Sequence, residues 1–207
     1  MSISLPYYAK IKDRYCIMYA GHCEEYVFLL KLVRPVLTQQ FPDLDIHLAC
    51  RDDFMYLLDG DRKTLSRSVL KKRHAEFGYI REIRGKMKGP HPIYELFTES
   101  DLPIPTLCNH VTTDCRLCYI NPEGSLPTKR MTAQQIEACT EMAQFQGYHV
   151  RVTTDHNTTK QAGWVIGVEN ISLFEAAVQG KRTSLVPTGV GTKLYEGLFP
   201  KGEILRI

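Results

Sequence analysis

The sequence lacks the features that mark membrane-spanning, secreted and disulfide-stabilised proteins. No segment reaches the roughly 18 consecutive apolar residues of a membrane span, and residues 1–14 lack the apolar block of a signal peptide. Its seven cysteines are odd in number and scattered, which favours reduced thiols over a disulfide framework. These absences predict a cytoplasmic protein, with peripheral attachment to a membrane left open.

A large excess of charge of one sign is also missing. The chain has 207 residues, 43% of them apolar and 24% charged, with a formal net charge of +3, which is too small to imply nucleic acid by itself. The charge is uneven, because residues 61–90 contain ten Lys or Arg against three Asp or Glu. This basic segment could bind a polyanion such as nucleic acid or an acidic lipid face. Few aromatic side chains interleave with the charges, so a solvated helix face is favoured and nucleic acid is disfavoured.

Recognised phosphate and metal motifs are absent as well. The loop at residues 189–193 is too short for a Walker P-loop, which requires a longer spacing between its glycines, and we find no acidic metal motif. Four possible zinc ligands occur together, but their spacing is poor and the last lies in an expected strand, where thiols are often just buried apolar groups. These residues are Cys108, His110, Cys115 and Cys118. The sequence alone does not decide whether this cluster binds zinc.

Apolar periodicity in the first half predicts alternating strands and helices. Residues 15–20 and 45–50 are short apolar runs, and apolar residues at helical spacing predict a helix over 24–40 between them. A strand, a helix and a strand in this order form a right-handed βαβ unit with parallel strands. A helical region over 52–74 and a third strand over 79–83 are expected next.

The second half repeats this alternation after a proline-interrupted segment. Prolines at positions 92, 103 and 105 break the periodicity and indicate a linker, so we expect halves at 1–104 and 105–207. The expected elements are strands over 117–120, 149–154, 164–167, 183–187 and 203–207, with helices over 133–145 and 171–179. The prediction is an α/β protein with two Rossmann-like halves, whose parallel sheets face one another across a cleft.

Residues 164–191 predict an anion site. A short apolar strand is followed by Asn170 and Ser172, whose side chains suit the start of a helix, and later by a loop that contains Gly189 and Gly191. Free amides and the helix dipole at the carboxyl edge of a parallel sheet attract anions. The succession therefore has the outline of a phosphate site.

Several sequence motifs follow one another in the order in which a known enzyme family has them. A glycine loop with an acidic residue leads into a helix that ends at Phe-Pro-Asp over residues 21–43, and Asn-Pro-Glu-Gly-Ser at 121–125 precedes Lys129 and Arg130. Residues 165–187 run as an apolar strand, an acidic turn, a helix with paired alanines, Gly-Lys and a strand. In these motifs the chain resembles GT-B glycosyltransferases, and most of all the bacterial heptosyltransferase-like group.

The chain departs from that family in identifiable places. Heptosyltransferases usually carry Asp-Thr-Gly-Pro-Leu-His after the strand, whereas residues 169–174 read Glu-Asn-Ile-Ser-Leu-Phe, without the glycine and the histidine. The acidic residue of the first loop is a glutamate instead of an aspartate. The chain is also much shorter than is usual for the family. The resemblance implies a compact, divergent GT-B fold, and the departures leave open a reduced acceptor-side half, an altered acceptor or lost activity.

The resemblance implies transfer of a sugar from a nucleotide-sugar donor, bound by the second half, to a glycan or lipid-linked acceptor, without a cofactor or a metal. Such a reaction needs a base for the acceptor hydroxyl and positive groups for the departing diphosphate. Glu25, or Glu24 beside it, is the expected base; the alternative is an exposed first-turn glutamate that only favours the helix dipole. Lys129 would neutralise phosphate, or be a solvated loop charge.

The remaining expected donor-binding residues have simpler alternatives. They are Ser125, Asn170, Ser172, Gly189 and Gly191, which would otherwise be turn and cap residues without a ligand. Glu175 would reach the donor ribose, or pair with a cation, or face solvent. Two other functions stay open: a non-catalytic nucleotide- or nucleotide-sugar-binding protein, and a polyanion-binding module.

Overall fold

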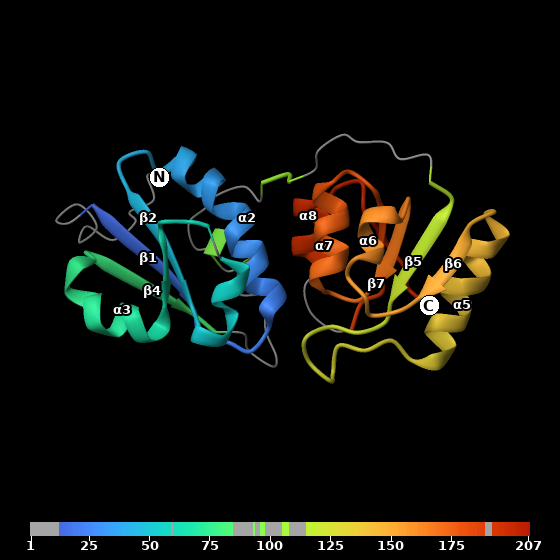
Figure 1. The fold of residues 1–207 in the computed structure, drawn as a ribbon. Helices are drawn as coiled ribbons and strands as arrows, with labels where there is room; N and C mark the ends of the chain where they lie inside the picture. Colours follow the sequence, from blue (N-terminus) through green and yellow to red (C-terminus); the bar gives the residue numbers. More distant parts are fainter. Residues whose placement is uncertain are drawn as a thin grey trace. The chain divides into compact units, whose positions relative to one another are not determined.

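The first part of the chain folds around a parallel four-stranded sheet (Figure 1). The computed structural model describes residues 13–58, 60–84, 93, 96–97, 105–107, 115–188 and 192–207. The sheet has the order β3-β2-β1-β4. Its unit contains β1 (Arg14–Tyr19), α2 (Glu24–Gln40), β2 (Asp45–Cys50), the 3-10 helix η1 (Asp52–Leu57), β3 (Thr64–Ser66), α3 (Arg67–Arg73), the 3-10 helix η2 (His74–Glu76) and β4 (Tyr79–Ile83).

Both faces of β1 are covered, which explains its continuous apolar run. Alternate side chains of a strand point to opposite faces of the sheet. Cys16 and Met18 pack in one buried cluster with Leu70 of α3. Ile17 faces the other side, where it lines an apolar pocket together with Leu37 of α2. The helices therefore lie on opposite faces of this sheet, as in a βαβ arrangement.

The second part of the chain forms a five-stranded parallel sheet of order β6-β5-β7-β8-β9. The chain divides accordingly into two compact units, Met1–Pro105 and Thr106–Ile207. The second unit contains β5 (Leu117–Asn121), α5 (Ala133–Phe145), β6 (His149–Val152), α6 (Thr158–Gln161), β7 (Trp164–Gly167), α7 (Ile171–Val178), β8 (Arg182–Leu185), α8 (Thr192–Leu198) and β9 (Glu203–Ile204).

Helices cover both faces of the second sheet. In Figure 1, α5 lies on one side and α6, α7 and α8 lie on the other. Trp164 of β7 is fully buried in the cluster on the α5 side, together with Cys139 and Ala143 of α5. Its indole Nε1 donates to Ser184 Oγ at 2.9 Å, and the Arg182 guanidinium lies 3.7 Å from its ring centroid. These contacts join β7 to β8 on the α5 side of the sheet.

The predicted α/β class, with parallel sheets in both halves, is confirmed, and so are the helices over 24–40 and 133–145. The expected helical region 52–74 is wrong in part, because it contains the strand β3, which pairs with β2. Three residues are too few to show strand alternation, and Ser66 at their end caps α3 by accepting from Val69 N. The helices α6 and α8 were not expected, and the first two residues of α8 were assigned to a loop. None of the helices that the structure describes combines the length and apolar character that a membrane crossing needs.

Candidate functional site

The carboxyl ends of β5 and β7 form the topological switch point of the second sheet. β5 pairs with β6 on one side and with β7 on the other, so the chain passes from β5 to β6 in one direction and then returns past β5 to β7. In open parallel sheets, ligands bind outside the carboxyl ends of the strands at such a point. Asn121 and Gly167 are paired at this edge, and they lead directly into residues 122–132 and 168–170. A ligand site is therefore expected at these two loops.

The loop after β5 is folded back on itself and holds Lys129 in one place. Gly124 N donates to Lys129 O at 2.7 Å, and Lys129 N donates to Leu126 O at 2.9 Å. Glu123 and Arg130 form an antiparallel bridge at the base of this turn. The side chain of Lys129 is thereby directed to the sheet edge by backbone hydrogen bonds.

Gly124 lies at a close approach of the two loops. A Cβ atom there would lie 2.8 Å from the Cβ of Lys129 and 3.0 Å from the carbonyl oxygen of Glu169. We expect Gly124→Ala to lower the free energy of unfolding of the second unit by about 1–3 kcal/mol, because the added methyl group forces the loops apart. Thermal unfolding measures this change, and Thr128→Ala at an exposed position of the same loop is the matched control. Equal stability of the two variants would contradict this close packing.

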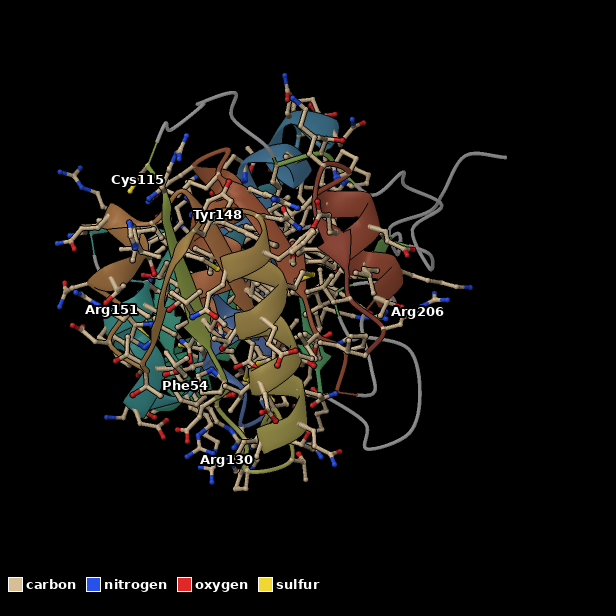
Figure 2. All side chains as sticks on the ribbon, turned by 90° about the vertical axis from the view of Figure 1, so that its right-hand side faces the viewer. Phe54, Cys115, Arg130, Tyr148, Arg151 and Arg206 are labelled. Atoms are coloured by element: carbon tan, nitrogen blue, oxygen red, sulfur yellow. The ribbon has the colours of Figure 1, made fainter. Side chains whose placement is uncertain are left out.

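Lys129 forms a buried ion pair with Glu169. Its Nζ lies 3.0 Å from Glu169 Oε2, and the two side chains are 11% and 4% exposed. The alternative of a solvated loop charge is therefore wrong for Lys129. The neighbouring cation Arg130 pairs with Glu123 at 3.0 Å, but both of these side chains are exposed, and Figure 2 shows Arg130 pointing outward.

Asn170 caps α7 and also ties the two loops together. Its Oδ1 accepts from Leu173 N at 2.9 Å, which confirms the expected helix cap. Its Nδ2 donates to Glu123 O at 3.0 Å. Asn170 therefore fixes the start of α7 against the loop after β5.

Ser172 belongs to a buried polar group on the α7 side of the sheet. It is fully buried, its Oγ accepts from Asn121 Nδ2 at 3.3 Å, and His156 Nδ1 lies 2.5 Å from the same oxygen. Burial raises the pKa of the adjacent Tyr119, so its phenol stays neutral. Sequence reasoning missed His156, although its position just after the strand over 149–154 was a usable signal.

The other expected donor-binding residues are less central. Ser125 lies half-buried in the loop after β5. Glu175 is half-buried in the middle of α7, where its Oε1 accepts from Gln179 Nε2 at 3.4 Å. Gly189 and Gly191 lie outside the described residues. The structure therefore brings Lys129, Asn170 and Ser172 to one sheet edge, and places Glu175 further along the helix.

The two candidate bases differ in their environments. Glu25 is fully buried in the first turn of α2, so the alternative of an exposed side chain is wrong for it. Glu24 is half-buried, and its Oε2 accepts from the hydroxyl of Tyr56 at 2.5 Å. Burial and this carboxylate raise the pKa of Tyr56 to about 12, so the phenol stays protonated and keeps Glu24 in place.

The same edge of the first sheet carries a cluster that sequence reasoning missed. Arg51, directly after β2, binds Asp53 with two hydrogen bonds of 3.0 and 2.7 Å. Its guanidinium also contacts Nδ1 of His22, an exposed residue just after β1. All three residues follow the ends of adjacent parallel strands, which is the signal that could have identified them.

The zinc alternative receives no support from the described residues. Cys115 is exposed and its Sγ donates to Gln161 O at 2.7 Å, whereas Cys118 is buried in the core and burial raises its pKa to about 12. Cys108 and His110 lie outside the described residues. Within the part of the chain that the structure describes, no group of three or more His, Cys, Asp or Glu is arranged to hold a metal ion.

The basic segment of residues 61–90 offers little for stacking on bases. Phe77 is buried, and Tyr79 stacks on Tyr15 with ring centroids 5.2 Å apart. Part of the charge is also compensated, since Lys63 pairs with Asp45 at 2.7 Å. The described aromatic side chains of this segment are therefore structural, which weakens the nucleic-acid alternative.

Three solved structures with a similar fold are glycosyltransferases. A family 9 glycosyl transferase from Veillonella parvula matches with a TM-score of 0.56 and 12% identity, over 93% of this chain and 86% of that chain. TibC, an iron-containing dodecameric glycosyltransferase from enterotoxigenic E. coli, matches at 0.55 and 10%, over 91% and 61%. The heptosyltransferase WaaC of E. coli, solved with ADP-2-deoxy-2-fluoro heptose, matches at 0.50 and 9%, over 93% of both chains.

These similarities concern the fold. No family model matches the chain, and no curated protein matches it. At identities of 9–12%, the shared arrangement of elements carries no information on individual site residues. The resemblance to heptosyltransferase-like glycosyltransferases expected from the motifs is confirmed at this level.

Proposed function

We propose that the chain is a glycosyltransferase that transfers a sugar from a nucleotide-sugar donor to a glycan or lipid-linked acceptor. The proposal rests on one observation. The loop after β5, which contains Lys129, and the start of α7 meet at the carboxyl ends of β5 and β7. This is the switch point of an open parallel sheet, in a fold shared with glycosyltransferases of known structure.

The donor diphosphate is the group that this edge would bind. Lys129 supplies a positive charge, and the start of α7 supplies amides and the positive end of the helix dipole. Ser172, bound to Asn121 and His156, holds the start of α7 beside β5. Lys129 and the amides would also stabilise the nucleoside diphosphate as it leaves. We propose that they do so without a metal ion. Transfer that persists after treatment with EDTA would support this part, and transfer restored only by an added divalent metal would contradict it.

Binding is tested by thermal unfolding in the presence of UDP, ADP, GDP and CMP sugars. ADP sugars come first, because WaaC was solved with an ADP-heptose analogue. A ligand at 100 times its Kd is expected to stabilise the protein by about 2.7 kcal/mol. Stabilisation with glycosyl transfer supports the enzyme, and stabilisation without transfer favours a non-catalytic nucleotide-binding protein. Salt-sensitive binding to DNA or RNA without any nucleotide response would favour the polyanion-binding module.

Glu175 is the residue proposed to contact the donor ribose. We expect Glu175→Ala to raise the Kd for the stabilising sugar nucleotide about tenfold, because a hydrogen bond to a carboxylate contributes about 1.5–3 kcal/mol. Gln179→Ala is the control, since it removes the amide that contacts Glu175 and leaves the carboxylate in place. An unchanged Kd in Glu175→Ala, measured by calorimetry, would remove Glu175 from the donor site.

A further inference from the structure

The Lys129–Glu169 ion pair lies where the proposed function puts the donor diphosphate. The pair is 3.0 Å long and nearly inaccessible to solvent. It is clamped by two independent contacts between the loops, the hydrogen bond from Asn170 to Glu123 O and the close approach at Gly124. The positive charge expected to receive a phosphate is therefore already bound by a carboxylate of the same protein.

The other cation of this loop is also compensated. Arg130 pairs with Glu123 at 3.0 Å, so the two cations and two carboxylates at this edge cancel. A diphosphate would bring negative charge to an edge where these two ion pairs already cancel. It would also lie close to the Glu169 carboxylate. Repulsion between two like charges is strong where water is largely excluded. Binding through Lys129 thus requires the carboxylate of Glu169 to move away.

We propose that Glu169 is a specificity-determining residue that occupies Lys129 in the absence of ligand and is displaced by the donor diphosphate. This inference rests on the proposed function, which supplies the identity of the anion. A free phosphate or pyrophosphate offers only its charge and competes poorly with Glu169. A nucleotide sugar adds contacts through its nucleoside and its sugar, and these contacts offset the displacement of the carboxylate. The cost of displacing Glu169 lowers the affinity for both kinds of anion, so small anions stay unbound at concentrations at which a complete donor still binds.

The test is a calorimetric titration of inorganic pyrophosphate into the native protein, Glu169→Gln and Glu123→Gln. Glutamine keeps the size of glutamate and removes its charge. We expect Glu169→Gln to bind pyrophosphate about tenfold to a hundredfold more tightly than the native protein, because Lys129 is then available to the anion. Glu123→Gln removes an equal charge from the exposed pair with Arg130 and is expected to change the Kd less than about threefold.

The shift in Tm with pyrophosphate is a second measurement, which still tests the proposal if Glu169→Gln is less stable than the native protein. Pyrophosphate should then raise the Tm of this variant more than that of the native protein, and the gain should disappear when Lys129→Met is added. If the native protein binds a sugar nucleotide but Glu169→Gln gains no affinity or Tm shift with pyrophosphate, the role of Glu169 is overturned while the proposed function stands. If neither protein responds to pyrophosphate or to any sugar nucleotide, both are overturned.

Discussion

Replacing Lys129 by methionine is expected to lower the free energy of unfolding of the second unit by about 3–5 kcal/mol. Methionine preserves much of the apolar stem but removes the ammonium group that lies 3.0 Å from Glu169 Oε2. The Glu169 side chain is only 4% exposed, so its carboxylate cannot replace this partner by full solvation. Urea-induced unfolding followed by Trp164 fluorescence measures the change in the unit that contains the pair.

Two further variants show whether burial is the cause of this loss. Arg130→Met breaks the neighbouring but exposed pair with Glu123, and we expect it to change stability by less than about 1 kcal/mol. The double variant Lys129→Met, Glu169→Gln removes both buried charges and should recover a large part of the loss. If Lys129→Met and Arg130→Met destabilise the protein equally, the Lys129–Glu169 pair does not have the energetics of a buried ion pair.

Replacing Glu24 by glutamine is expected to lower kcat for glycosyl transfer by about 10²–10⁴-fold, the usual contribution of a general base. Glu24 is the candidate base with solvent access, whereas Glu25 is fully buried in α2. The glutamine variant keeps the size of the side chain and loses the group that accepts the acceptor proton. The measurement is the initial rate of transfer with the sugar nucleotide identified by thermal unfolding.

Glu25→Gln and Tyr56→Phe are the matched variants for this prediction. Tyr56 donates to Glu24 at 2.5 Å, so Tyr56→Phe should lower the rate by about tenfold through loss of orientation, while the carboxylate remains. Glu25→Gln should change stability rather than the rate of the folded protein, since its side chain has no exposed surface. Full activity of Glu24→Gln together with an inactive, folded Glu25→Gln would assign the base to Glu25.

Local patterns in the sequence were sufficient to predict most of the elements. The helix over Glu24–Gln40 shows apolar residues at helical spacing, and the helix over Ala133–Phe145 follows Thr132, which forms a capping box with Gln135. Asn170 likewise marked the start of α7. Prediction failed at β3, whose three residues are too short for any periodicity and which exists because β2 offers a partner.

By itself the sequence determined the α/β class, the alternation of strands and helices, and which polar residues follow the strand ends. Each of these depends on residues that are close in the chain, where periodicity and capping act. Only the tertiary structure decided that Lys129 meets Glu169, that His156 meets Ser172, and that Glu25 is buried while Glu24 is not. Ion pairing and burial depend on which loops the parallel sheet brings together, and residues 16 or 40 positions apart leave no local pattern that records their contact.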